Sequence, residues 1–308
     1  MVKKRVSTLF SSMCFYTKIA FNTCFMSLTP FNLIQKELET MIPKEEVNLL
    51  PKKWEKLGDI LVIKLPASLE SFSDKIGEVY ANILACDAVL VDTGGIIGRF
   101  REPEIKHIFG RKNTETMHHE NGISFHLDPQ KIMYSSGNMK ERKRISTISN
   151  PSETIVDLFA GIGYFTIPIA VYSKPKKIFA CEINPAAFRF LKKNISENNV
   201  ENIVEPLHGD SKQISPKEIA DRVVMGYFHE TSLFLETAIN ALKDHKGIIH
   251  YHDTFPDKKI PESPLDQIQT ICNPFDRVAY LLSYQKIKSY APGISHYVFD
   301  IEIKEREN

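Results

Sequence analysis

Two glycines and two acids are spaced as in a turn that binds a nucleoside. Asp157 is followed by Gly161 and Gly163, and Glu182 lies nineteen residues beyond Gly163. Glycine lets the backbone turn sharply and approach a ligand closely. An acid at the end of the following strand can accept hydrogen bonds from ribose hydroxyls. These residue types therefore indicate a site for a nucleoside and the groups attached to it.

The elements around this turn follow in the order strand, turn, helix and strand. Residues 154–156 are β-branched and predict a buried strand. Residues 165–172 predict a helix, and residues 177–181 predict a second strand that ends beside Glu182. A dinucleotide-binding turn would have a third glycine where Thr166 stands. The arrangement instead resembles a class I S-adenosylmethionine-dependent transferase, and the alternative is an ordinary turn whose glycines serve packing.

A third acid follows the next predicted strand. Residues 203–207 predict that strand, and Asp210 and Ser211 come after it. In transferases of this class, an acid at this point holds the adenine amino group. Strands and helices then alternate, and two strands over residues 278–287 and 296–303 end the chain. We expect an α/β fold with a Rossmann-like, doubly wound sheet closed by a C-terminal hairpin.

The composition is that of an ordinary globular chain with room for two domains. The 308 residues carry a net charge of +1, with 43% hydrophobic and 25% charged residues. This balance argues neither for nor against nucleic acid, so any RNA contact must use local basic patches. The five cysteines are scattered and contain no C-x-x-C pair. We therefore predict neither a disulfide framework nor a metal site, which fits a reducing cytoplasm.

The domain plan has three parts. Residues 1–28 predict an atypical extension, in which Lys18 interrupts the apolar run so that no membrane span fits. We interpret residues 1–25 as the product of a start codon assigned too far upstream, which mass spectrometry of the native N-terminus tests. Residues 29–130 predict a small α+β domain with a basic stretch that is either solvated or contacts RNA. Residues 131–308 predict the catalytic domain.

A polar segment links the two domains. Ser135 and Ser136 can cap a following helix. Arg142 lies about two helical turns after Ser135, so both side chains could face one ligand. An arginine can clamp a carboxylate with two parallel hydrogen bonds. The alternative for this segment is a surface helix rich in ion pairs.

Several stretches taken together resemble one known family. They are residues 131–142, the glycine turn at 156–165, residues 221–227, residues 247–252 and residues 290–293. The chain is similar to the archaeal form of the tRNA wybutosine-synthesizing protein 2 family, the aminocarboxypropyltransferases that act on tRNA(Phe). The resemblance runs from about Phe31 to Lys304. The family is similar in fold to the tRNA guanine-N1 methyltransferases that act at position 37.

The resemblance implies a set of residues that bind S-adenosylmethionine. Glu182 takes the ribose, and Asp210 takes the adenine amino group beside Ser211. Ser135 and Arg142 flank the methionine part. The implied reaction moves the 3-amino-3-carboxypropyl group to C7 of 4-demethylwyosine in the anticodon region of tRNA(Phe), and the N-terminal domain helps to dock the tRNA.

Two residues bear on the chemistry and on its alternatives. The methyltransferases carry Asn-Leu-Pro or Asn-Pro-Pro where this chain has Gly226-Tyr227-Phe228. This departure argues against the first alternative, a tRNA guanine-N1 methyltransferase. The second alternative is a non-catalytic RNA-binding protein, against which the intact acid and glycine set argues. His229 is the candidate base for the C7 proton, with a surface histidine as the alternative. His250 and His252 share a strand face, and we expect structural roles for them.

Overall fold

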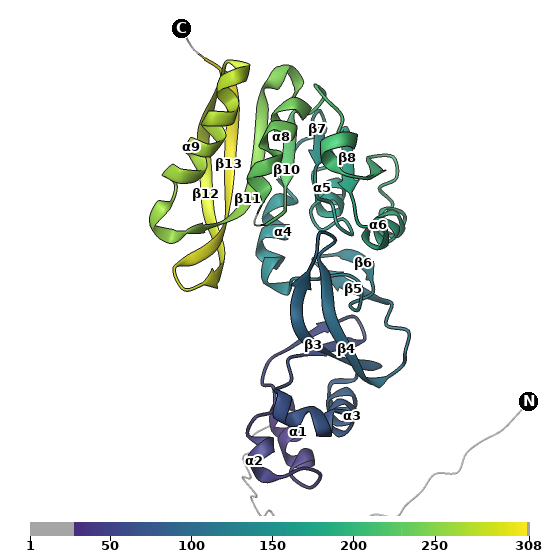
Figure 1. The fold of residues 1–308 in the computed structure, drawn as a ribbon. Coiled ribbons are helices and arrows are strands. Elements are labelled where there is room, and N and C mark those ends of the chain that lie inside the picture. The colour runs from purple at the N-terminus through teal and green to yellow at the C-terminus, as the bar shows by residue number, and fades with distance from the viewer. Residues whose placement is uncertain (1–27, 229, 307–308) are drawn as a thin grey trace, which may run out of the picture.

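The computed structural model describes residues 28–228 and 230–306, which form an elongated molecule (Figure 1). A small N-terminal part occupies one end, and a larger part built on a broad sheet occupies the other. Almost all of the predicted N-terminal extension, the candidate base His229 and the last two residues lie outside the described residues. No helix among the described residues is long and apolar enough to cross a membrane.

The N-terminal part is a four-stranded sheet covered by helices. Its helices are α1 (Pro30–Leu38), α2 (Lys44–Val47) and α3 (Ser73–Leu84), with the 3-10 turn η1 (Ala67–Phe72) leading into α3. Its strands are β1 (Trp54–Leu57), β2 (Ile60–Ile63), β3 (Ala88–Ile97) and β4 (Glu102–Gly110), which pair in that order. Buried side chains from α1, α3 and the sheet form one core, including Ile34, Leu38, Ile76 and Tyr80. Apolar spacing of three and four along the helices produces this packing.

The β3–β4 hairpin is longer than the sequence indicates. Two successive glycines predict a turn at Thr93-Gly94-Gly95. This prediction is wrong, because β3 continues to Ile97 across a register shift between Asp92 and Gly95. A bulge of this kind lets a strand bend while its pairing continues. The hairpin consequently projects from the N-terminal part and reaches the larger part (Figure 1).

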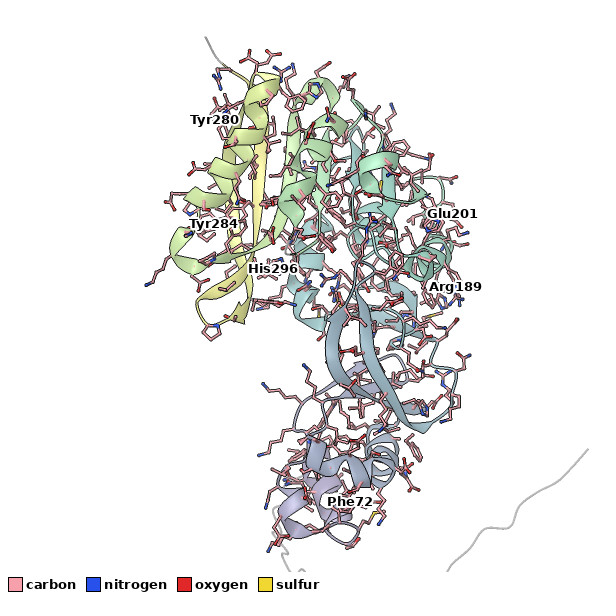
Figure 2. The ribbon with its side chains drawn as sticks, in the orientation of Figure 1. Phe72, Arg189, Glu201, Tyr280, Tyr284 and His296 are labelled. Atoms are coloured by element: carbon pink, nitrogen blue, oxygen red, sulfur yellow. The ribbon has the colours of Figure 1, made fainter. Side chains whose placement is uncertain are left out.

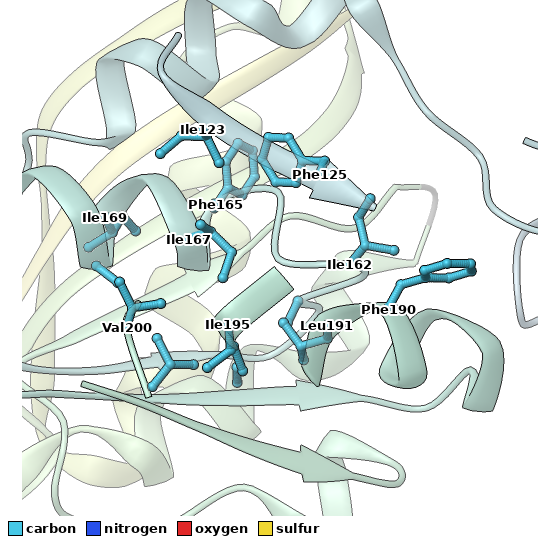
Figure 3. Packing of buried hydrophobic residues seen from close by; sticks show 14 of the residues in the cluster. Ile123, Phe125, Ile162, Phe165, Ile167, Ile169, Phe190, Leu191, Ile195 and Val200 are labelled. Atoms are coloured by element: carbon cyan, nitrogen blue, oxygen red, sulfur yellow. The ribbon is translucent and has the colours of Figure 1, made fainter. Parts of the chain in front are cut away.

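A short hairpin connects the two parts. An Asn-Gly pair predicts a hairpin turn at Asn121-Gly122, with a strand on either side. The strands β5 (Thr116–Glu120) and β6 (Ile123–Leu127) confirm this pairing. Although the sequence groups it with the N-terminal part, its apolar side chains Ile123 and Phe125 lie in the same cluster as Phe165 and Ile167 of the larger part (Figure 3). This hairpin therefore shares the hydrophobic core of the larger part.

The larger part is the doubly wound sheet that the sequence predicts. Its strands are β7 (Thr154–Asp157), β8 (Lys177–Glu182), β9 (Val204–His208), β10 (Arg222–Met225), β11 (Gly247–Pro256), β12 (Arg277–Ala291) and β13 (Ile294–Glu305). The order is β12-β13-β11-β10-β7-β8-β9. Strand β13 pairs antiparallel with both β11 and β12, and the other neighbours pair in parallel.

Helices cover both faces of this sheet. They are α4 (Met139–Ile145), α5 (Thr166–Tyr172), α6 (Pro185–Glu197), α7 (Ser211–Ile214), α8 (Leu235–Ala241) and α9 (Glu262–Cys272). The 3-10 turns are η2 (Ser136–Asn138), η3 (Thr231–Phe234), η4 (Lys243–His245), η5 (Asp257–Lys259) and η6 (Asn273–Phe275). One core contains side chains of α4, α5 and α6, and a second contains side chains of α8 and α9. The sheet is thus buried on both sides, as parallel sheets are.

Candidate functional site

The glycine turn sits at the carboxyl end of the central strand β7. Asp157 ends this strand and is buried, where it accepts hydrogen bonds from the Thr166 hydroxyl at 2.7 Å and the Phe159 N–H at 3.1 Å. Burial raises the pKa of Asp157 to about 6. Through these two hydrogen bonds, Asp157 holds the start of the turn and the start of helix α5 in place.

The two predicted glycines have different roles. Gly161 has a φ of +60°, and its N–H donates to Glu182 at 2.7 Å. Gly163 has a φ of +100°, and a Cβ there would lie 2.5 Å from the Ile167 side chain. Gly161 consequently borders the ligand side of the turn, whereas Gly163 permits close packing beneath it.

Glu182 lies at the end of β8 and closes the turn. One carboxylate oxygen accepts from Gly161, and the other accepts from the Asn184 N–H at 2.6 Å. Burial raises the pKa of Glu182 to about 7, and the two backbone donors oppose that shift only in part. The carboxyl group is therefore held in one place by backbone donors.

Asp210 and Ser211 begin the short helix α7. The Asp210 carboxylate accepts from the Lys212 N–H at 3.0 Å and forms an ion pair with Arg99 at 2.6 Å. Arg99 belongs to the loop between β3 and β4, so the N-terminal part contacts a predicted site residue directly. The 111 residues that separate this pair hide the contact from sequence inspection.

A cavity of about 530 Å³ joins these residues. Gly161, Glu182, Asp210 and Ser211 all line it, so the structure brings together four of the predicted site residues. The sequence did not indicate the lining residues Phe100, Phe159 and Phe234, whereas Arg101 lies in the predicted basic stretch and Tyr227 at the position of the methyltransferase signature. Aromatic residues in or beside loops were the available signal for these positions, and the sequence does not show which loops come together.

Ser135 and Arg142 contact each other but are not among the residues that line the cavity. Arg142 is buried and forms an ion pair with Glu120, with 2.7 Å between its Nε and a carboxylate oxygen. Its Nη1 donates to the Ser135 carbonyl at 2.9 Å. The predicted helix cap is wrong, because the Ser135 hydroxyl makes no capping bond and accepts instead from Lys288 at 2.8 Å. Contact of this pair with a ligand stays a prediction.

The histidines of β11 have buried polar partners. His250 lies 2.6 Å from Asp300 and 2.7 Å from Arg222, which fits the structural role expected for it. His252 lies 3.1 Å from His296 of the neighbouring strand β13. Figure 2 labels His296. Burial holds the pKa of both His252 and His296 below the usual range. No group of three metal-ligating side chains occurs within residues 28–228 and 230–306.

Comparisons with known proteins cover nearly the whole described chain. The family model for the TRM5/TYW2 methyltransferase domain matches residues 116–280, and the model for the TYW2 N-terminal domain matches residues 34–114. A "tRNA(Phe) (4-demethylwyosine(37)-C(7)) aminocarboxypropyltransferase" of Methanocaldococcus jannaschii is 43% identical over 82% of this chain and 98% of its own length. A "tRNA (guanine(37)-N(1))-methyltransferase Trm5b" of Pyrococcus abyssi is 34% identical over 89% of this chain and 85% of its own length.

Solved structures agree with these matches. The structure of P. horikoshii TYW2 in complex with MeSAdo has a TM-score of 0.80 at 38% identity. The match covers 89% of this chain and 98% of the TYW2 chain. The structure of M. jannaschii TYW2 in complex with AdoMet has a TM-score of 0.68 at 37% identity. That match covers 82% of this chain and 100% of the TYW2 chain. The fold, the arrangement of the cavity residues and these matches lead to one conclusion: the chain belongs to the TRM5/TYW2 family.

Proposed function

We propose that this protein transfers the 3-amino-3-carboxypropyl group of S-adenosylmethionine to C7 of 4-demethylwyosine at position 37 of tRNA(Phe). The observation that carries the proposal is the 43% identity to a relative of that name, over 98% of the relative's length. A second relative of the same name, from Pyrococcus horikoshii, is 41% identical over 96% of its length. The acids and the glycine turn that a nucleoside site requires are all present in this chain.

The cavity residues fit an S-adenosyl group. Glu182 stands at the end of β8 with its carboxylate fixed by two backbone donors, where a ribose diol would donate to it. Asp210 offers a carboxylate to an exocyclic amine, and the cavity wall beside it includes Ile183 and Phe234. Gly161 packs closely against another residue of the cavity wall, since a Cβ there would lie 2.7 Å from the Tyr164 ring.

When bound, the co-substrate supplies a sulfonium that activates its attached carbons, so that a C–C bond forms at C7 as methylthioadenosine departs. The residues of this chain then mainly orient the two reactants. Glu182 and Asp210 would hold the nucleoside end of S-adenosylmethionine. The orientation of the bound molecule then determines which of the three carbons attached to the sulfonium faces the tRNA base. The C7 proton leaves after attack, and His229 is proposed as the base that accepts it.

The end of β10 favours this transfer over guanine-N1 methylation. The methyltransferase signature places an asparagine where Gly226 stands. A Cβ at Gly226 would lie 2.7 Å from the Phe165 ring, so an asparagine there requires Phe165 to move. The following Tyr227 and Phe228 carry no amide that could hold a guanine edge in its place.

The proposal includes the anticodon region of tRNA(Phe) as the macromolecular partner. The N-terminal part would help to dock it, and the cytoplasm is the proposed compartment. The three described cysteines, Cys86, Cys181 and Cys272, are free thiols, as a reducing compartment favours.

The affinity for methylthioadenosine should depend on pH through Glu182. The ionised carboxylate accepts from ribose hydroxyls better than the neutral acid does, and its pKa in the free protein is raised to about 7. Affinity should therefore rise with pH and level off above about pH 8, with a gain of about 20-fold between pH 5.5 and 7.5. Isothermal titration calorimetry with methylthioadenosine, which carries no carboxyl or amino-acid amine, measures this. The Glu182→Gln variant should give weaker and nearly flat binding, and an unchanged slope in that variant would assign the titration to another group such as Asp157.

Position-specific labelling tests the proposed function. The full chain is incubated with tRNA(Phe) carrying 4-demethylwyosine and with S-adenosylmethionine labelled at either the carboxyl carbon or the methyl carbon. The carboxyl label should enter the tRNA and the methyl label should not. Entry of the methyl label alone would replace the proposal with methyl transfer, and entry of neither label would support the non-catalytic RNA-binding alternative.

A further inference from the structure

Two asparagines at the end of helix α6 bind the edge of strand β6 that β5 leaves unpaired. Strand β6 pairs only with β5, so the backbone groups on its other edge need partners. Asn198 accepts from the Ser124 N–H at 3.0 Å and donates to the Ser124 carbonyl at 2.8 Å. Asn194, about one helical turn earlier, accepts from the His126 N–H at 2.7 Å and donates to the His126 carbonyl at 3.2 Å. The two side-chain amides therefore take the place of a neighbouring strand.

Asn194 also reaches the glycine turn. Its Nδ2 atom donates to the Ile162 carbonyl at 2.9 Å, and Ile162 lies between Gly161 and Gly163. Within residues 28–228 and 230–306, no backbone N–H donates to that carbonyl. A buried carbonyl without a donor is destabilising, so the turn depends on the Asn194 amide for this hydrogen bond.

The Asn194 amide has a partner for each of its polar atoms. Its nitrogen donates to the carbonyls of Ile162 and His126, and its oxygen accepts from the His126 N–H. Because a carbonyl can only accept and an N–H can only donate, these partners allow one orientation of the amide. Asn194 is fully buried, so bulk water does not compete for these bonds. One side chain thus holds the helix, the hairpin and the glycine turn together.

Helix α6 packs against the same turn with apolar side chains. Leu191 and Ile162 belong to one buried cluster, which Figure 3 shows. A Cβ on Gly163 would lie 3.2 Å from the Leu191 side chain. Ala187 of the same helix lines the cavity. The position of the turn relative to α6 therefore also determines where the Gly161 N–H lies in the cavity wall.

We propose that Asn194 is a positioning residue for the co-substrate, because its bond to the Ile162 carbonyl holds the glycine turn in the shape that the nucleoside binds. The inference rests on the proposed function for the identity of the co-substrate. Asn194 is not among the residues that line the cavity, so it acts through the turn. Asn198 docks the same hairpin, but its donors reach the carbonyls of Ser124 and Asn194, so it separates support of the hairpin from support of the turn.

The test compares Asn194→Asp with a matched control, Asn198→Asp. Each change keeps the size and the acceptor of the side chain and removes its donors. Titration calorimetry is performed below the unfolding transition of each protein. Asn194→Asp should weaken binding of methylthioadenosine by about 10-fold, and Asn198→Asp should stay within about 2-fold of wild type. Asn194→Ser, which leaves room for a water molecule beside the Ile162 carbonyl, serves if the aspartate variant does not fold and should weaken binding by about 5-fold.

Hydrogen exchange in the ligand-free protein gives a second readout. Amides of residues 158–165 should exchange about 10-fold faster in the Asn194 variants than in the wild type, because the turn opens more readily. In Asn198→Asp, faster exchange should be confined to the hairpin at residues 116–127. A folded Asn194 variant that binds methylthioadenosine within about 2-fold of wild type would overturn the inference. Equal losses of affinity in Asn194→Asp and Asn198→Asp would assign Asn194 to hairpin docking alone and would also overturn it.

Steady-state kinetics separates positioning of the co-substrate from a general loss of folded enzyme. In Asn194→Asp, the KM for S-adenosylmethionine should rise in proportion to the lost affinity, while kcat stays within about 3-fold of wild type. A loss of folded enzyme would instead lower kcat and leave KM unchanged, which would contradict the inference. Failure of the proposed function itself is distinct, because the wild-type protein would then bind methylthioadenosine but transfer no carboxyl label.

Discussion

Replacing Glu182 by alanine should weaken binding of methylthioadenosine and of S-adenosylmethionine by about 100-fold, because two charge-assisted hydrogen bonds to the ribose are lost. The change also removes the acceptor of the Gly161 N–H at 2.7 Å and of the Asn184 N–H at 2.6 Å. The turn and the strand end then lose the group that joins them, which adds to the loss of the ligand contacts. Titration calorimetry with each nucleoside measures the effect.

The matched control for this variant is Glu205→Ala. Glu205 lies on the neighbouring strand β9, where its half-exposed side chain pairs with Lys177 at 3.3 Å. This variant should bind both nucleosides as the wild type does. A Glu182→Ala protein that keeps its thermal unfolding transition and binds within about 3-fold of wild type would remove Glu182 from the nucleoside site.

Replacing Arg142 by methionine should lower the free energy of unfolding by about 3–5 kcal/mol, because it leaves the buried Glu120 carboxylate without its partner. Arg142 is 3% exposed and Glu120 is 6% exposed, so water cannot replace the guanidinium. The Tyr134 hydroxyl, which donates to Glu120 at 2.9 Å, would remain as its neutral partner. Urea unfolding followed by circular dichroism measures the loss, and Lys140→Met, at an exposed position of the same helix, should change it little.

A paired variant separates the structural role of Arg142 from a role in binding. Changing Glu120 to leucine together with Arg142→Met removes both charges and should recover most of the lost stability. If this variant then binds methylthioadenosine normally and S-adenosylmethionine weakly, Arg142 also holds the methionine part, as the family resemblance implies. A single Arg142→Met variant as stable as the wild type would contradict the ion pair.

The part of the site that could be predicted from sequence is the part encoded locally. The strand that ends at Asp157, the turn at Gly161 and the strand that ends at Glu182 follow one another within a short stretch. Their hydrophobic pattern and turn residues determine their conformation, so their placement at one edge of the sheet was predictable. Asp210 followed from the same alternation of strands and helices.

The rest depends on contacts between distant segments. Arg99 reaches Asp210, and Arg101 reaches Tyr227, only because β3 continues through Gly94 and Gly95 and carries its loop across to the other sheet. Glycines in a strand indicate a turn as readily as a bulge, and local sequence does not distinguish the two. The Glu120 partner of Arg142 was hidden in the same way, because the β5–β6 hairpin contributes to a core that its position in the chain does not indicate.

The nucleoside released from S-adenosylmethionine tests the central claim most directly. The full chain is incubated with S-adenosylmethionine and tRNA(Phe) carrying 4-demethylwyosine, and the small molecules are separated by chromatography. The account predicts methylthioadenosine, formed in proportion to the tRNA modified and absent when the tRNA is omitted. Release of S-adenosylhomocysteine in its place would contradict the account and make this protein a methyltransferase.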